Sequence, residues 1–159
     1  MARGGPVRRT RQGDFELRLD GGDRDVLRGL PGQLRELLER EDPSSDPAVA
    51  RLYPAAYPDD PLRNLEYEQV AGDDLTAGRL AAIDRMEATL DADRLSEDDV
   101  LAWLGVCNDL RLVLGSRLDI TEETTQRDFA REDPRSRAYA LYTYLTWLVD
   151  AIVEGLRID

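Results

Sequence analysis

One segment, residues 97–118, constrains the fold of this 159-residue chain most, because it is apolar around its whole circumference. Ser96 and Asp99 have the spacing of a capping box, which predicts that a helix begins there. A helix that is apolar on all sides is normally buried. We therefore expect this helix to be central to the core. Its apolar residues are Trp103, Leu104, Val106, Cys107, Leu110, Leu112, Val113 and Leu114.

Apolar residues at helical spacing predict further helices on both sides of this segment. Pro31 should kink the first of them, and Asp133 with Pro134 should form the N-cap and first position of the last. The sequence thus predicts a mainly α fold, a compact bundle of about five helices. The predicted helices cover residues 24–40, one turn around 48–52, and residues 62–90, 97–118, 121–131 and 134–156.

The N-terminal part of the chain has a different pattern. Residues 15–19 alternate apolar and charged side chains, and residues 7–11 precede them across a turn, which predicts a small N-terminal β-hairpin. Residues 1–13 form a basic arm or strand with four arginines. Residues 42–61 contain five prolines and predict an ordered loop. We interpret residues 1–159 as a single helical domain.

Composition excludes several classes of function. The formal net charge is −12, so nucleic acid is expected to be contacted only indirectly, and a basic protein surface is a better partner. All 21 basic residues are arginine and there is no histidine, which removes the commonest general base and metal ligand. We find no phosphate-binding loop, nucleophile elbow or cysteine pair. The sequence therefore predicts no enzymatic activity, no cofactor and no metal.

The distribution of apolar residues also bears on location. No uninterrupted apolar run approaches the roughly 20 residues needed to cross a bilayer. The basic N-terminus is not followed by the apolar stretch of a secretory signal. We expect a cytoplasmic protein without membrane association.

A polar run, Asn108, Asp109 and Arg111, interrupts the most apolar helix. Asn108 and Arg111 can share a face, whereas Asp109 points elsewhere. In one interpretation Arg111 pairs with an acid on a neighbouring helix and Asn108 caps or bridges, and we favour it because buried charges are normally paired. In the other, the run is a polar contact for a partner. Cys107, the single cysteine, is expected to be packed and inert, with a redox role as the alternative.

Aromatic residues provide a second set of candidates. Tyr53, Tyr57 and Tyr67 flank the proline-rich loop and are candidate partner contacts, because tyrosine and tryptophan are typical interface anchors. Tyr144 or Trp147 is expected to fall off the core face of the last helix. Core lining is the alternative interpretation, and it is favoured for the helical aromatics.

Residues 103–118, with their Asn-Asp-Leu-Arg-Leu-Val-Leu-Gly core, closely resemble an uncharacterised-domain family of high-GC Gram-positive bacteria. That family includes the actinobacterial oxidative-stress regulator. Residues 17–41, 64–90 and 138–156 resemble the same family, so the resemblance covers most of the chain. It implies a cytoplasmic protein often encoded near a protease adaptor and cysteine-biosynthesis functions.

For the characterised branch of this family, the resemblance implies a thiol redox sensor that associates with a stress sigma factor and modulates transcription. That branch uses two cysteines separated by five residues. Counted from Cys107, the second would fall at Val113 or Leu101, and neither is cysteine. The disulfide switch therefore does not carry over, whereas the scaffold and the binding of a partner do.

Together these observations predict a non-catalytic regulatory protein that acts by protein–protein binding, with a sigma factor or a protease adaptor as candidate partner. Two alternatives stay open. One is a small-ligand-binding or enzymatic helical domain that uses acidic residues in a pocket between helices. The other is a redox sensor that works through Cys107 alone. Homodimerisation through the amphipathic helices is a further alternative.

Overall fold

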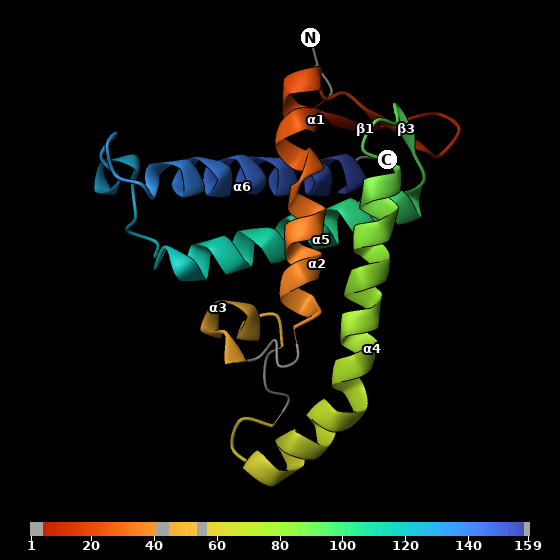
Figure 1. Cartoon of the computed structure of the whole chain (residues 1–159). Helices are drawn as coiled ribbons and strands as arrows, with labels where there is room; N and C mark the ends of the chain where they lie inside the picture. The colour runs from red at the N-terminus through yellow and green to blue at the C-terminus, as the bar shows by residue number, and fades with distance from the viewer. Residues whose placement is uncertain (1–4, 41–44, 54–56, 158–159) are drawn as a thin grey trace.

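The computed structural model describes residues 5–40, 45–53 and 57–157, so parts of the predicted basic arm and proline-rich loop lie outside the described residues. The described chain is mainly α-helical with a small N-terminal sheet, as predicted (Figure 1). The helices are α1 Gly21–Arg28, α2 Leu30–Leu38, α3 Pro47–Ala50, α4 Pro61–Ala88, α5 Glu97–Arg117, the short 3-10 helix η2 Gln126–Asp128, and α6 Ser136–Arg157. The strands are β1 Val7–Arg9, β2 Phe15–Leu17 and β3 Arg94–Leu95.

Helix α5 is the central element of this arrangement. The predicted capping box is present: the Asp99 backbone N–H donates to Ser96 Oγ (3.1 Å), and the Ser96 backbone N–H donates to the Asp99 carboxylate (2.9 Å). Helices α2, α3, α4 and α6 all contact α5. The apolar circumference of α5 is thus covered from several directions, as its sequence predicts.

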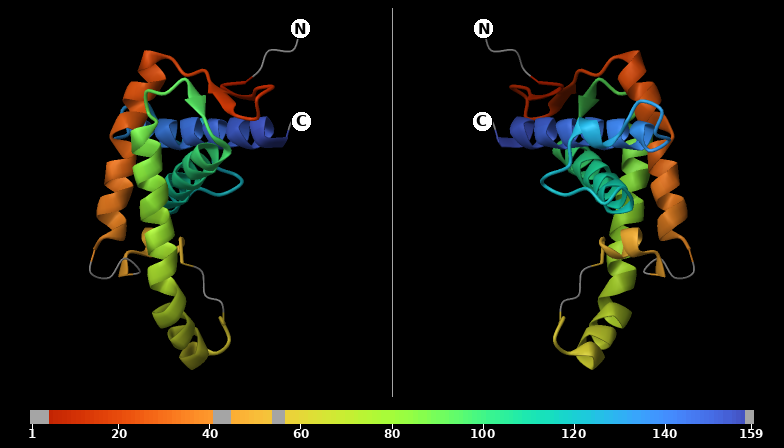
Figure 2. Two further views of the ribbon diagram at one scale, coloured as in Figure 1. Left: turned by 90° about the vertical axis from the view of Figure 1, so that its right-hand side faces the viewer. Right: turned by 90° about the vertical axis from the view of Figure 1, so that its left-hand side faces the viewer.

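The helices form two crossing layers. Antiparallel α5 and α6 lie side by side in one layer, and α1, α2 and α4 cross them in the other (Figures 1 and 2). In the second layer α2 is joined to α4 by Arg35, which pairs with Asp84 (2.7 Å) and with Glu87. Ile83 and Met86 of α4 are buried between the layers.

The predicted hairpin is present, with a third strand that the sequence analysis missed. Strand β1 pairs antiparallel with β2, with Val7 opposite Leu17, and the turn contains Gly13 at φ +92°. Strand β3 pairs with the other edge of β2, Phe15 opposite Leu95. Two residues are too few for an alternating pattern to be recognised, and only the tertiary fold brings β3 to this edge.

The predicted helix over residues 24–40 is two helices, which corrects the expectation of a single kinked one. The chain breaks at Gly29, and Pro31 lies in the first turn of α2, where its missing N–H costs no hydrogen bond. Helix α1 starts earlier than predicted, with Asp20 and Asp23 in a capping box. Its Arg24 is buried and donates to the backbone carbonyl of Leu90 (2.6 Å).

The prediction of a helix over residues 121–131 is wrong. Only the short 3-10 turn η2 forms there, between turns and bends. Side chains in this segment bond to nearby backbone groups instead: Thr124 Oγ1 accepts from the Thr121 N–H (2.9 Å), and the Asp128 carboxylate accepts from the Thr125 N–H (2.7 Å). Such local bonds compete with helix formation. Phe129 then stacks on Tyr139, with ring centroids 4.5 Å apart.

Asp133 and Pro134 precede α6, but the regular helix begins at Ser136. The Asp133 carboxylate accepts from the Arg135 N–H (2.8 Å), as an N-cap side chain does. The Ser136 N–H donates to the Asp133 carbonyl (2.9 Å), so the first turn is tighter than an α-helix. The predicted single turn around residues 48–52 is found as α3 and the residues that follow it.

The contact between β1 and α6 makes a specific prediction at Gly155. A Cβ there would lie 2.6 Å from the backbone oxygen of Val7, so alanine must push the strand off the helix. We expect Gly155→Ala to lower the free energy of unfolding by about 1–3 kcal/mol, measured by urea denaturation.

Gly105→Ala is the matched control, because a Cβ at that position of α5 meets nothing within 4 Å. It should raise stability by up to about 1 kcal/mol, since alanine is the better helix former. Equal effects of the two substitutions would contradict the close approach of β1 to α6.

Candidate functional site

The polar run on α5 divides between two faces of the helix. Arg111 Nη2 donates to Asn108 Oδ1 (2.7 Å) within the helix. Asp109 points the other way and accepts from Arg79 Nε of α4 (3.0 Å). The sequence analysis expected Arg111 to form the interhelical ion pair. The structure shows that Asp109 forms it instead. The partners are 30 positions apart in sequence, so no local pattern indicates the pairing.

The Asp109–Arg79 pair belongs to a larger polar cluster. Asp109 is only 9% exposed, and burial raises the pKa of its carboxyl, while the charge of Arg79 and the hydrogen bond from it oppose the shift. The Arg79 guanidinium lies 5.1 Å from the ring centroid of Tyr53, whose hydroxyl hydrogen-bonds to Thr76 Oγ1 (2.8 Å). The cluster joins α5 and α4 to the chain after α3, and its polar groups bind one another.

Cys107 is buried in the core of α5, and burial raises the pKa of its thiol to about 12. The thiolate is the reactive form of cysteine, so this environment keeps the thiol inert. This geometry fits the packed, structural interpretation of Cys107.

The three candidate tyrosines do not form one group. Tyr53 is part of the Arg79 cluster, whereas Tyr57 and Tyr67 meet at the start of α4, edge to face, with centroids 6.1 Å apart. The Arg63 guanidinium lies 4.4 Å from the Tyr57 ring centroid. The Tyr57 N–H donates to Asn64 Oδ1 (3.2 Å), which holds the approaching chain against the helix.

Two exposed leucines accompany these tyrosines, and sequence analysis did not select them. Leu62 is 69% exposed and Leu65 is 51% exposed, on the half of α4 that projects beyond the two layers (Figure 2). We refer to Tyr57, Leu62, Arg63, Leu65 and Tyr67 together as the α4 tip.

The exposed leucines lie on the same side of α4 as two core residues further along the helix. Leu62 and Leu65 precede Leu80 and Ile83 by 18 positions, which is five turns of an α-helix. Each pair therefore lies on the same side of α4, and Leu80 and Ile83 pack into the core. Asp73 and Thr76 lie between the two pairs on this side of α4, so Leu62 and Leu65 form a separate, exposed apolar pair. Apolar residues keep helical spacing in the second half of the predicted helix and are weaker in the first half, so periodicity did not indicate this pair.

Two neighbouring aromatic residues of α6 differ in their exposure to solvent. Trp147 is exposed and lies beside Tyr144, with ring centroids 5.6 Å apart. The Tyr144 hydroxyl is buried, and burial raises the pKa of this tyrosine. This pair lies on a different helix from the α4 tip.

Neither a metal-binding group nor a membrane-spanning helix is found among the described residues. Across residues 5–40, 45–53 and 57–157, no group of three or more cysteine, aspartate or glutamate side chains is placed to hold a metal ion. No helix within these ranges combines the length and apolar character needed to cross a membrane.

Comparison with known proteins places the chain in a family. A family model described as a domain of unknown function, DUF2017, matches residues 4–156. The chain belongs to the DUF2017 family. A search of curated proteins found no match, and neither did a search of solved structures. The match spans both the polar run of α5 and the α4 tip, so both features lie within the DUF2017 domain.

The environment of Cys107 predicts slow thiol chemistry. In the native protein, iodoacetamide at pH 8 should modify Cys107 on the timescale of unfolding, because the thiol is buried and protonated. In urea the modification should be complete within minutes, as seen by intact-protein mass spectrometry. Fast labelling of the native protein would contradict this environment.

The Asp109–Arg79 pair predicts a pH-dependent loss of stability. Arg79→Met leaves a buried carboxylate without its cation and should cost about 3 kcal/mol at pH 7. The folded-state pKa of Asp109 is raised. Its contribution to the free energy of unfolding is therefore most favourable at low pH and is lost as the pH rises through that pKa. The deficit of the variant should therefore shrink as the pH is lowered toward 4, measured by urea denaturation.

Two further variants control this experiment. Adding Asp109→Asn to Arg79→Met removes the unpaired charge and should recover much of the lost stability at pH 7. Arg85→Met, on the same helix, removes an exposed arginine that pairs with Asp99 (2.9 Å) and should cost less than about 1 kcal/mol. If Arg79→Met and Arg85→Met lower the free energy of unfolding equally, the buried Asp109–Arg79 pair stabilises the protein no more than a surface ion pair does.

Proposed function

We propose that this chain is a non-catalytic regulatory domain that acts by binding another protein, and that the α4 tip is its binding surface. The observation that carries this proposal is the pair of leucines, Leu62 and Leu65, that the described chain leaves exposed on the projecting half of α4. An exposed apolar face on a projecting helix is typical of helix-in-groove recognition.

The energetics support a partner at this surface. Full burial of a leucine side chain contributes about 1.5–3 kcal/mol, so two leucines provide a substantial part of a binding free energy. Tyr57 and Tyr67 add aromatic surface beside them, and the ring of Tyr57 is already held by Arg63. Aromatic residues next to aliphatic anchors are common at interface hot spots.

The charge around the α4 tip indicates the character of the partner. Exposed acids flank the leucines on the projecting half of α4 and in the turn before it, and the whole chain has a net charge of −12. A partner with an apolar groove and a basic rim complements this surface. The flanking acids are Asp59, Asp60, Glu66, Asp73 and Asp74.

Within this proposal, the partner is a sigma factor and the domain regulates transcription under stress in the cytoplasm. The support is the resemblance of residues 103–118 to the family of high-GC Gram-positive bacteria that includes the oxidative-stress regulator. A protease adaptor is the second candidate partner, on the same resemblance. Nucleic acid would then be reached only through the partner. The buried environment of Cys107 argues against a thiol switch as the means of control.

The test is an interface variant with a matched control. Leu62→Gln with Leu65→Gln removes the exposed apolar pair without changing charge, whereas Val26→Gln removes an apolar residue from α1 that is as exposed as Leu65, 51%. Affinity capture under reducing and oxidising conditions identifies partners, and the affinity of each purified partner is then measured directly. We expect the double variant to weaken binding at least about tenfold and Val26→Gln to leave it unchanged.

Four outcomes would contradict parts of the proposal. If no protein is captured above background, protein binding is not the function. If capture is unaffected by the double variant, the α4 tip is not the surface. If the captured protein is a second copy of the chain and the double variant is monomeric, the tip is a dimer interface. If binding depends on oxidation, Cys107 has a redox role in controlling it.

A further inference from the structure

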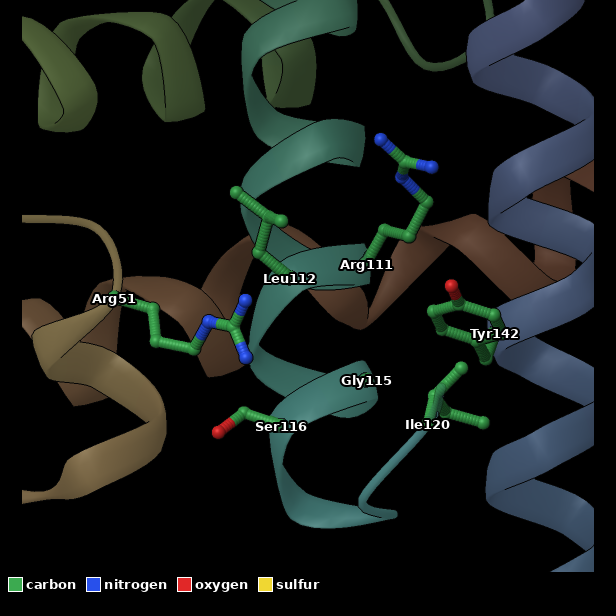
Figure 3. Close-up of a pocket in the computed structure, with 7 residues that line it drawn as sticks. All are labelled: Arg51, Arg111, Leu112, Gly115, Ser116, Ile120 and Tyr142. Atoms are coloured by element: carbon green, nitrogen blue, oxygen red, sulfur yellow. The ribbon is translucent and has the colours of Figure 1, made fainter. Parts of the chain in front are cut away.

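Helix α6 carries an exposed tryptophan on the side that faces away from α5. Tyr142 lines a small hollow beside α5, close to Gly115, and so marks the inner side of α6 (Figure 3). Trp147 follows five residues later, which is about 140° further around the helix, so its ring points away from α5. Trp147 is 47% exposed. Tryptophan is enriched among the residues that dominate binding at interfaces.

The exposed residues in line with Trp147 are small or acidic. They are spaced alternately by three and four positions, so they lie one above another along the helix. Two small side chains precede Trp147 and two carboxylates follow it. No basic residue occurs between Arg137 and Arg157, so the middle of α6 has no cation of its own. We call this set the α6 outer face: Ala140, Thr143, Trp147, Asp150 and Glu154.

Two further carboxylates approach the tryptophan from α1. The ring of Tyr144 lies beside that of Trp147, with centroids 5.6 Å apart. Burial raises the pKa of Tyr144, and the charges of Asp23 and Asp20 raise it further, so the first turn of α1 is close to this aromatic pair. Asp20 and Asp23 accept hydrogen bonds from backbone N–H groups in their capping box. Within the part of the chain that the structure describes, none of the four carboxylates around Trp147 forms an ion pair with an arginine.

We propose that the α6 outer face docks a basic helix of a partner protein, with one arginine stacked on Trp147 and others paired with Asp150 and Glu154. The face of an indole ring attracts a cation more strongly than the other aromatic side chains do. The unpaired carboxylates on both sides of the ring attract and orient a basic segment. The small side chains of Ala140 and Thr143 allow a second helix to approach α6 closely.

Charge also separates this occupant from the others that could cover the same face. Nucleic acid and anionic membranes are repelled by the carboxylates around Trp147. A second copy of this chain brings its own net charge of −12, so self-association is disfavoured as well. The α6 outer face and the α4 tip lie on different helices, and this proposal does not depend on the α4 tip.

The test is titration of the intact protein, by isothermal calorimetry, with a blocked alanine-based helical peptide that has arginine at positions i, i+3 and i+7. These positions repeat the spacing of Trp147, Asp150 and Glu154. We expect saturable binding. It should weaken at least about tenfold when glutamine replaces the three arginines, and also when the arginines are moved to i, i+2 and i+5, because they then leave one side of the helix.

Variants of the protein locate the bound peptide. Trp147→Ala, and separately Asp150→Asn with Glu154→Gln, should each raise the Kd at least about tenfold. All three side chains are exposed, so these variants are expected to fold. Asp73→Asn with Asp74→Asn is the matched control, because it changes the net charge by the same amount through exposed acids of α4. It should leave the Kd within about twofold.

Several results would overturn the proposal. One is the absence of saturable binding, or equal binding of the arginine and glutamine peptides. An equal loss in the α4 control would mean general attraction to an acidic chain, and a loss in Leu62→Gln with Leu65→Gln would place the peptide on the α4 tip. An unchanged Kd in Trp147→Ala would remove the ring from the site. If the protein self-associates and Trp147→Ala is monomeric, the α6 outer face is an interface between copies.

Discussion

Burial of α5 on all sides is the constraint on which the rest of this structure depends. A helix with apolar residues around its circumference must be covered from several directions, and α2, α3, α4 and α6 provide that cover. Polar groups on α5 then have to be satisfied inside the protein. Asp109 binds Arg79 of α4, and the Trp103 indole N–H donates to Thr89 Oγ1 (2.8 Å). These bonds link α5 to α4 and fix how the two helices cross.

The sequence predicted what depends on local pattern and missed what depends on tertiary contacts. The α5 capping box, the N-terminal hairpin and the mainly α class follow from spacing and alternation, and all were confirmed. The short strand β3 was not predicted, because it forms only through a distant partner: Leu95 pairs with Phe15, 80 positions earlier in the chain. The break at Gly29 and the irregular chain over residues 121–131 were also missed, although local bonds explain the second of them.

The candidate sites show the same limit. The divergence of Asn108 and Asp109 could be predicted from helix geometry, but the partner of Asp109 could not, because Arg79 lies on another helix. Tyr57 and Tyr67 were selected by residue type, while Leu62 and Leu65 were not selected, because apolar spacing is weak in the first half of the predicted helix. Only the packing shows that the described chain leaves them exposed.

The projection of α4 has a consequence for the energetics of recognition. Its first half projects beyond the two layers and contacts the described chain at Tyr57, so its helical state depends largely on backbone hydrogen bonds and intrinsic propensity. Gly72 lowers that propensity by about 1 kcal/mol relative to alanine, and it is not in a tight contact that requires glycine. Under the proposed function, local unwinding at the α4 tip is coupled to docking: a partner that requires the helical form must also supply its ordering free energy. Helix propensity at positions the partner never touches would then set part of the affinity.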